Sequence, residues 1–379
     1  MTNTVYLDHA ATTPLDGEVL QKMIPYLTDV YGNADSPHAV GRKAMLAVDS
    51  ARDAVAQALN AKPNEIYFTS GGTESDNWAV LGGAYAQGKK GKRHVLISAV
   101  EHHAVLYCAE RLQADGFDVE FLPVSNTGTL DVATLQRYLR KDTALVCVMA
   151  ANNETGALFP TRELAAAANA CGALFFADCV QLAPHMEIDV KALGADMLSL
   201  SAHKFYGPKG AGVLYIKNGV KIEKHVGGGE QERGLRGGTL NVPAVVGLAC
   251  ALEKTKRELP ARQEKMRALR AAFLRTVSVL DGLSVNGDGL PAVLNLRVAG
   301  VKNDTLLYRL DLEGVAVSAG SACASASVKP SHVLTAMGLS EKQARECVRI
   351  SFGKENTEED VVRAGEIFVN VVKNVRGEK

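Results

Sequence analysis

Apolar positions along the first half of the chain follow two alternating periods. Residues 44–59 carry apolar side chains at the three-to-four spacing of a helix that buries one face. Short runs rich in β-branched and aromatic residues then alternate with stretches of helical spacing. The predicted strands are Ile66–Thr69, His94–Ser98, Val119–Leu122, Ala144–Met149 and Leu174–Ala177, and the predicted helices between them are Glu74–Ala86 and Ala104–Ala114. This alternation is typical of a doubly wound, mainly parallel sheet that binds ligands at the carboxyl ends of its strands.

The pattern changes in the last third of the chain. A long, charged stretch of helical spacing, Leu252–Thr276, is expected to lead into a second and smaller domain. Val293–Val298 and Val348–Phe352 are predicted strands of that domain, and Glu358–Val372 is its predicted closing helix. The chain is therefore expected to be an α/β protein with one large and one small domain.

Composition and charge narrow the class of protein. The 379-residue chain is 47% hydrophobic and carries 42 basic and 42 acidic side chains. This composition favours a soluble globular protein, and balanced charge gives no general attraction to nucleic acid or to an acidic membrane surface. The longest apolar run, Val242–Leu252, is too short to span a bilayer, and the N-terminus reaches Asp8 before a signal core could form. The seven cysteines are odd in number and show no C-x-x-C pair, so we expect a reducing, cytoplasmic setting.

The segment 69–77 (TSGGTESDN) is the first candidate site. It follows a predicted strand, turns at two glycines and opens a helix near Thr73. Free N–H groups and the positive end of the helix dipole favour a bound phosphate at such a point, and Thr73 adds a hydroxyl. An ordinary helix N-cap with acidic residues in its first turn explains the segment equally well, because no lysine follows as a P-loop requires.

The second candidate is Asp178, which comes directly after an apolar strand. An acid at the carboxyl end of a strand is well placed to pair with a buried cation, such as the ring nitrogen of a pyridoxal phosphate cofactor. Gln181, three residues further on, could reach the phenolic oxygen of the same ring. An exposed loop acid is the plainer alternative.

The third candidate is the segment 199–210 (SLSAHKFYGPKG), where Ser201 and His203 come just before Lys204. A lysine that carries a cofactor as a Schiff base needs a fixed backbone, nearby phosphate donors and an amine made less basic by its surroundings. This segment can supply all three. A single lysine is more often a solvated surface side chain, but here the glycine turn, the strand-end acid and the lysine follow in order, each after a strand.

The fourth candidate is Cys323, within the segment 319–327 (AGSACASAS) of small residues with almost no apolar anchor. A loop of this composition is expected to be mobile, and a free thiol is intrinsically nucleophilic. We therefore expect Cys323 to be a reactive thiol. The cysteines expected to be small buried side chains are Cys108, Cys147, Cys171, Cys250 and Cys347.

Together these segments resemble the pyridoxal-phosphate-dependent cysteine desulfurases of the NifS/IscS type, in the class-V aminotransferase family. The resemblance runs from Tyr6 to Gly353, and the segments that match in order and spacing are SGGTESDN, EHHAV, NNETG, SAHKFYGPKG, ERGLRGGT and GSACASAS. It implies the aspartate-aminotransferase fold (fold type I), with a seven-stranded, mainly parallel sheet in a large domain over 15–255. A smaller α+β domain over 1–14 and 256–379 would carry the cysteine segment, and the protein would be a homodimer.

The resemblance also assigns roles to individual residues. Lys204 would carry the cofactor, His102 would stack on its ring and could shuttle protons, and Cys323 would attack the sulfur of L-cysteine. The residues expected to hold the cofactor are Gly72, Thr73, Ser201, His203 and Thr239 at the phosphate, Asp178 at the pyridine nitrogen and Gln181 at the phenolic oxygen. Thr239 would act across the dimer interface. Asn153 and Arg349 would bind the substrate carboxylate, which the planar fork of arginine matches.

The implied products are alanine and a persulfide on Cys323, which an acceptor such as an iron–sulfur scaffold would receive. No resident metal is expected, although Cys323 could transiently share an iron–sulfur cluster with a scaffold. A selenocysteine lyase shares this chemistry and stays open, whereas a small aminotransferase would need no mobile thiol. An inactive scaffold subunit is disfavoured by the complete lysine, acid and thiol set. A metal site at His102 and His103 is least favoured, because adjacent side chains point apart.

Overall fold

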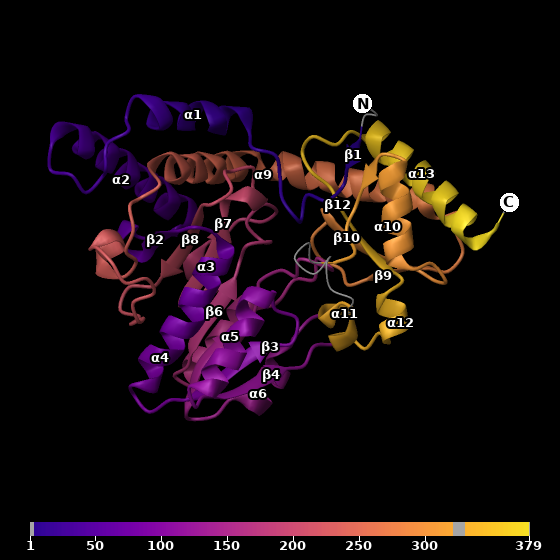
Figure 1. Ribbon diagram of the computed structural model, residues 1–379. Coiled ribbons are helices and arrows are strands. Elements are labelled where there is room, and N and C mark those ends of the chain that lie inside the picture. The colour runs from indigo at the N-terminus through magenta and orange to yellow at the C-terminus, as the bar shows by residue number, and fades with distance from the viewer. Residues whose placement is uncertain (1–3, 321–329, 379) are drawn as a thin grey trace.

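The computed structural model describes residues 4–320 and 330–378, which form a large lobe and a small lobe (Figure 1). A seven-stranded sheet crosses the large lobe in the order β2-β8-β7-β6-β5-β3-β4. Its strands are β2 (Ile66–Thr69), β3 (His94–Ser98), β4 (Asp118–Leu122), β5 (Thr143–Cys147), β6 (Leu174–Asp178), β7 (Met197–Ser201) and β8 (Gly212–Ile216). Only β8 runs antiparallel to its neighbours β2 and β7, and the other six strands all run in one direction. The mainly parallel sheet expected from the sequence is therefore confirmed.

Helices cover both faces of this sheet, so its strands are buried. Every residue of β3, β5 and β7 is buried, and the middle of β3 and of β5 is accordingly apolar without interruption. One face packs against α3 (Gly72–Asn77), α4 (Gly83–Gly88) and α5 (His103–Ala114). The other face packs against α2 (Ala39–Leu59), α7 (Thr161–Ala170) and α9 (Val242–Val277). The remaining helices of the large lobe are α1 (Gly17–Thr28), α6 (Val132–Tyr138) and α8 (Val190–Leu193).

The helix predicted over Glu74–Ala86 is present but is not uniform. A wider π turn over 78–82 separates α3 from α4. At this turn the indole N–H of Trp78 donates to the carbonyl of Glu223 at 3.0 Å. A Cβ at Gly82 would come within 2.6 Å of Ile222, so the glycine permits the close approach of segment 222–223. The helix widens where this segment packs against it, which the apolar spacing does not reveal.

The small lobe is built on an antiparallel sheet of β9 (Leu283–Asn286), β10 (Val293–Val298) and β12 (Cys347–Ser351). The first strand of the chain, β1 (Val5–Tyr6), pairs in parallel with β11 (Val315–Ala316) in this lobe. The core here includes residues of α10 (Asn303–Leu312) and α13 (Glu358–Arg376). The short helices α11 (His332–Ala336) and α12 (Glu341–Ala344) place residues in the core of the large lobe, so they join the two lobes.

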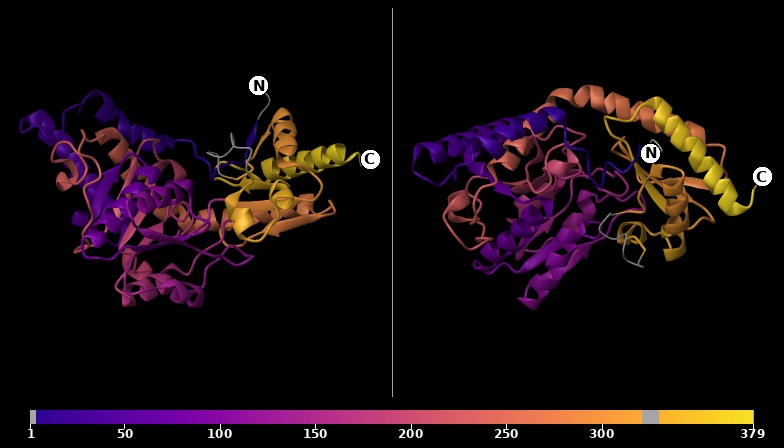
Figure 2. Two further views of the ribbon diagram at one scale, coloured as in Figure 1. Left: turned by 60° about the horizontal axis from the view of Figure 1, so that its bottom comes forward. Right: turned by 45° about the horizontal axis from the view of Figure 1, so that its top comes forward.

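Helix α9 runs along both lobes and packs against α1, α2 and α13 (Figure 2). It begins at Val242, ten residues before the helix that the sequence predicted. Pro243 lies in its first turn, where proline is tolerated, and Gly247 packs directly on Met23. Because of these two residues, the hydrophobic pattern did not reveal where the helix begins.

Within residues 4–320 and 330–378, no helix has both the length and the apolar character needed to cross a bilayer.

Candidate active site

The carboxyl ends of the parallel strands open into a cavity of about 170 Å³. Asp178 and Ser201 are the last residues of β6 and β7, and Lys204 follows in a 3₁₀ turn over 202–204. The cavity brings together ten of the twelve residues that the sequence singled out. They are Gly72, Thr73, His102, Asn153, Asp178, Gln181, Ser201, His203, Lys204 and Arg349. Ligand binding at strand carboxyl ends is the general rule for open α/β sheets.

Two predicted residues are not in this group. Thr239 is exposed and lies outside the lining of the cavity. Cys323 lies outside the described residues, so its expected role stays a prediction. Of the cysteines expected to be buried, Cys108, Cys147 and Cys347 are buried. The expectation was wrong for Cys171 and Cys250, which are half-buried: Cys171 is the C-cap of α7, and Cys250 lines a surface groove beside α1 and α2.

Lys204 is held at the cavity by the N-terminal segment of the chain. Its Nζ donates to the carbonyls of Ala10 at 2.7 Å and Ala11 at 2.9 Å. The amide of Gln181 donates to the same Ala10 carbonyl at 2.8 Å. Residues 10 and 11, which the sequence did not assign, therefore orient two of the predicted side chains. No local pattern could reveal this contact, because it joins positions about 170 to 190 residues apart.

Asp178 is a buried acid, 5% exposed, at the base of the cavity. One of its oxygens accepts the backbone N–H of Val180 at 2.8 Å. Burial raises the pKa of this carboxyl to about 6, while the Val180 hydrogen bond and the charge of Lys204 act in the opposite direction. The alternative of an exposed loop acid is therefore wrong.

A second buried acid, Asp76, also lines the cavity and was not assigned from the sequence. Burial and the neighbouring charge of Asp178 raise its pKa well above the ordinary value. Its Oδ1 has no hydrogen-bond partner within the described part of the chain. The sequence presented Asp76 only as a first-turn acid, and nothing local distinguishes it from the half-buried Glu74 beside it.

The start of α3 forms a small cradle next to Ser201. Gly71 is the N-cap, with a φ of 154° and no side chain to cap the helix, and Glu74 lies in the first turn. A Cβ at Gly72 would lie 2.9 Å from Val180 and 3.4 Å from the Cβ of Ser201. Nearby, Nδ1 of His203 lies 3.0 Å from the hydroxyl of Thr12, and burial lowers the pKa of His203 to about 4. The cradle thus offers hydroxyl, imidazole and helix-end donors to an anion.

His102 lines the cavity from the N-cap position of α5. Its Nδ1 accepts the backbone N–H of Ala104 at 3.2 Å. Burial lowers the pKa of the imidazole to about 4, and the charge of Lys204 contributes in the same direction. A neutral ring whose Nδ1 accepts a hydrogen bond carries its proton on Nε2, so the second ring nitrogen of His102 is a donor.

Arg349 also lines the cavity and is 1% exposed. Its Nη1 donates to the Asn153 carbonyl at 2.9 Å, and its Nη2 donates to Asp8 Oδ1 at 2.8 Å. Its Nε has no hydrogen-bond partner among the residues that the structure describes. A buried guanidinium with a spare donor suits an anionic ligand, because an unsatisfied buried donor is costly.

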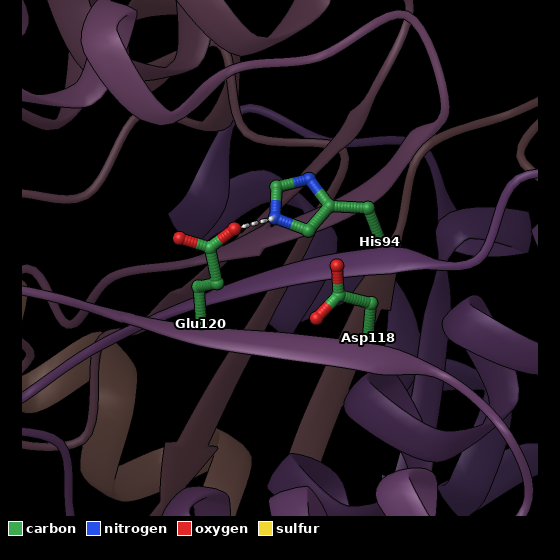
Figure 3. A group of neighbouring side chains, drawn as sticks. All are labelled: His94, Asp118 and Glu120. Atoms are coloured by element: carbon green, nitrogen blue, oxygen red, sulfur yellow. Dashed lines mark ion pairs between the residues drawn. The ribbon is translucent and has the colours of Figure 1, made fainter.

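A separate group of ionisable side chains lies at the amino ends of the strands, away from the cavity. His94 opens β3, and Asp118 and Glu120 lie on β4, with all three side chains directed toward one another (Figure 3). Arg140 contacts both carboxylates, at 2.6 Å in the case of Asp118. Both carboxylates therefore already pair with a cation of the protein, and we interpret the group as a structural ion network.

Comparison with known proteins gives a consistent set of relatives. The aminotransferase class-V family model matches residues 5–363. The chain is 44% identical to the cysteine desulfurase IscS of Clostridium botulinum, over 99% of this chain and 96% of that protein. It is 42% identical to the cysteine desulfurase IscS of Methanosarcina thermophila, over 98% and 93%.

Solved structures agree with these relatives. A NifS-like protein matches with a TM-score of 0.92 and 36% identity, covering 98% of this chain and 100% of that one. The structure of SspA in complex with cysteine matches with a TM-score of 0.83 and 35% identity, covering 92% and 99%. Sequence and structure comparisons therefore extend over nearly the whole chain.

Proposed function

This chain belongs to the class-V aminotransferase family, and on that premise we propose that it is a pyridoxal-phosphate-dependent cysteine desulfurase. Its substrate is L-cysteine, and its products are L-alanine and a persulfide on the enzyme. The single observation that supports this function most directly is the cavity itself. There a lysine, a buried acid, a glycine cradle and a buried arginine meet at the carboxyl ends of one sheet.

The donor set of the cavity fits pyridoxal phosphate. Lys204 would hold the cofactor through its amine, and the buried Asp178 would pair with the ring nitrogen. Gly72, Thr73, Ser201 and His203 would bind the phosphate at the start of α3, and Gln181 would reach the phenolic oxygen. When bound, pyridoxal phosphate withdraws electrons from the substrate and stabilises the charge left at the α-carbon.

The proton chemistry follows from the two basic side chains at the cavity. Once substrate has displaced it, the amine of Lys204 is the group able to take the α-proton. His102 already uses Nδ1 to accept the Ala104 N–H, so its Nε2–H donates rather than accepts. We therefore assign the general-base role to Lys204, and to His102 the role of a ring that packs on the cofactor and donates a hydrogen bond.

Arg349 and Asn153 would orient the substrate by its carboxylate. Binding of that carboxylate would satisfy the spare Nε donor of the guanidinium, which the carbonyl of Asn153 and the carboxylate of Asp8 hold in place. This arrangement would fix the Cβ–Sγ bond of cysteine in the cavity. Positioning of this kind is a large part of enzymatic rate acceleration.

Cys323 would receive the sulfur. Its thiolate would attack the substrate sulfur, so that an S–S bond forms and the Cβ–Sγ bond breaks. The carbon keeps the electron pair of the broken bond and is protonated to give alanine. Cysteine and the enzyme thiol thus become alanine and a Cys323 persulfide, with no external oxidant or reductant.

We further propose that the protein is a homodimer. Apolar side chains are exposed along α1 and α2, among them Leu20, Leu27 and Leu46, at 41%, 58% and 65%. An exposed apolar face of this kind favours association. The exposed Thr239, outside this chain's cavity, would then contact the phosphate bound by the neighbouring subunit.

The persulfide would pass to an acceptor protein that serves iron–sulfur cluster assembly or another thiolation, as the relatives named IscS suggest. A cytoplasmic location is supported by the six cysteines of the described chain, all of which are free thiols.

A domain division at residues 14/15 and 255/256 also stays a proposal. It is supported by the pairing of β1 with β11 in the small lobe.

Mass spectrometry after incubation with cysteine tests the function. The protein loaded with cofactor should release alanine, and a one-sulfur adduct should appear on Cys323. The Cys323→Ala variant should keep the cofactor absorbance but form neither the adduct nor alanine. Unchanged alanine release from this variant would contradict the proposed function.

A further inference from the structure

The cysteine segment is taken here as residues 321–330, and the residues that flank it, Gly320 and Ser331, both lie close to the side chain of Glu154. On the C-terminal side, the hydroxyl of Ser331 donates to Glu154 Oε2 at 2.5 Å. On the N-terminal side, a Cβ at Gly320 would lie only 3.0 Å from the same oxygen and 3.3 Å from Cδ. One carboxylate therefore accepts a hydrogen bond from the residue that follows this stretch and leaves little room beside the glycine that precedes it.

Glu154 is itself rigidly held. It is 2% exposed, and its backbone N–H donates to Asn152 Oδ1 at 2.9 Å. The same amide oxygen accepts the backbone N–H of Thr155 at 3.0 Å, which closes a tight turn after β5. The carboxylate thus belongs to a fixed part of the large lobe, although it contacts residues that follow the small-lobe strand β11.

The turn that holds Glu154 also builds the substrate-binding wall. Its neighbour Asn153 lines the cavity and accepts a hydrogen bond from Arg349. Arg349 is linked to the N-terminal side of the cysteine segment, because its backbone N–H donates to Ser318 at 2.6 Å and the Ser318 N–H donates back at 3.1 Å. The wall and both ends of the segment are therefore joined through two adjacent residues, Asn153 and Glu154.

One further contact fixes the C-terminal end of the segment. Nε2 of His332, the first residue of α11, lies 2.9 Å from the carbonyl of Glu101 in the large lobe. This bond is next to the Ser331–Glu154 bond in the chain, but its acceptor is a backbone carbonyl, which a side-chain substitution does not remove. A single substitution of Glu154 would thus loosen both ends, while the His332 bond and the Ser318–Arg349 backbone pair remain.

We infer that Glu154 is a positioning residue, which sets the ends of the cysteine segment beside the substrate-binding wall. The inference rests on the proposed function, because that function gives Cys323 its sulfur-accepting role. Glu154 would act on sulfur transfer through the placement of the segment and would leave cysteine binding to Arg349 and Asn153. Removal of the carboxylate should therefore affect the reaction at Cys323 and spare the binding step.

A rapid-quench experiment on the cofactor-loaded enzyme tests this separation. The first turnover is followed through the appearance of alanine and of the Cys323 persulfide, and cysteine binding is followed through the change in cofactor absorbance. In Glu154→Ala, we expect the first turnover to slow by about tenfold to a hundredfold. The cysteine concentration for half-maximal binding should stay within about twofold of the parent value, because the cavity wall is unchanged.

The conservative variant Glu154→Gln distinguishes the loss of the Ser331 hydrogen bond from a general loss of folded structure. Its amide oxygen can still accept the Ser331 hydroxyl, so it should react nearly as fast as the parent. Three results would overturn the inference. These are a parent-like first turnover in Glu154→Ala, a loss of cysteine affinity by the same factor as the rate, and equally slow turnover in Glu154→Gln.

Ser331→Ala provides the second test, with Ser340→Ala as its matched control. Both serines cap short helices, Ser331 at α11 and Ser340 at α12, and only Ser331 contacts Glu154. Both variants lose a cap worth about 1 kcal/mol. A slow first turnover in Ser331→Ala alone supports the inference, and equal rates in the two variants overturn it. A parent protein that forms no Cys323 persulfide would instead contradict the proposed function.

Discussion

The two ends of the large sheet carry ionisable groups of the same kinds, yet they differ in how these groups are paired. At the carboxyl ends, Oδ1 of Asp76 and Nε of Arg349 have no partner among residues 4–320 and 330–378. At the amino ends, Arg140 contacts both Asp118 and Glu120. Histidine and acids occur at both ends, so residue types alone do not distinguish a site from a structural network.

The difference lies in the buried polar atoms that have neither a hydrogen bond nor an ion pair among the described residues, as Oδ1 of Asp76 and Nε of Arg349 do at the carboxyl ends. A buried polar group without a partner costs stability, so it is expected where a ligand completes the arrangement. At the amino ends both carboxylates pair with Arg140, and Nδ1 of His94 lies 2.9 Å from the hydroxyl of Thr143. Nε2 of His94 has no hydrogen bond among the described residues but pairs with Glu120 at 3.4 Å. Substitutions at the carboxyl ends should therefore alter chemistry, whereas substitutions at the amino ends should alter stability only slightly.

The largest effect is expected from Lys204→Ala. This variant loses the covalent attachment of the cofactor and the general base, so turnover should fall by about 10⁴-fold or more. The absorbance of the attached cofactor should disappear. The far-ultraviolet circular dichroism spectrum, which reports the folded backbone, should stay unchanged. The control is Lys217→Ala, since Lys217 follows β8 at the amino ends and pairs with Asp196 at 3.4 Å. Equal losses in the two variants would remove the distinction between the ends.

Asp178→Asn should have the next largest effect. The variant keeps the shape of the side chain but loses the charge that would stabilise a cationic ring nitrogen. Turnover should fall by about 10²–10³-fold, as for removal of one preorganised electrostatic group. Steady-state rates and the cofactor spectrum measure this effect. Asp118→Asn makes the same chemical change at the amino ends, and its activity should match that of the parent.

A pH-dependent effect is expected from Glu101, which lies between β3 and His102 at the carboxyl ends. Burial raises the pKa of this carboxyl to about 8, above its value of 4.5 in an exposed chain. The folded state therefore binds this proton more tightly than the unfolded state does. Its contribution to stability is complete below the unfolded pKa and is lost as the pH rises toward about 8, by at most about 1.4 kcal/mol per pH unit.

Glu101→Gln tests this dependence, because glutamine mimics the protonated acid. The free energy of unfolding of the variant, relative to the parent, should increase between about pH 5 and about pH 8. Urea unfolding across this range measures the difference. Glu120→Gln is the matched control at the amino ends, and its difference from the parent should vary much less with pH. A flat difference for Glu101→Gln would show that Glu101 is ionised in the folded protein.

The sequence predicted those features that depend on local pattern. Strand β10 was predicted with its observed bounds, and the turn before α3, the strand-end Asp178 and Lys204 were each found from the residues next to them in the chain. Strands β7 and β8 were not predicted in the strand series, although β7 is buried along its whole length. The two serines within β7 weakened its apolar signal, and buried serines are recognisable only once their packing is known.

The features that the sequence did not reveal depend on contacts between distant positions. The carbonyls of residues 10 and 11 reach Lys204, Asp8 reaches Arg349, and Glu154 reaches Ser331, each across more than 170 positions. The motifs contain Glu154 and Asp76 but give no reason to select them from their neighbours. Only the fold shows that Asp76 lines the cavity and that Glu154 meets both ends of the cysteine segment.

The smallest effect is expected from Arg140→Ala, which tests whether the amino-end group is a structural network. Arg140, Asp118 and Glu120 are 43%, 57% and 33% exposed, so their ion pairs are well solvated. The free energy of unfolding should therefore fall by no more than about 1 kcal/mol, and turnover should be unchanged.

Zinc should not raise the melting temperature of the parent, because Arg140 holds the two carboxylates. It should raise that of the variant, where the three ligand atoms lie within 4.8 Å of one another without a competing cation. Stabilisation of the parent by zinc would mean that the amino ends hold an incomplete site as well, and the comparison between the two ends would fail.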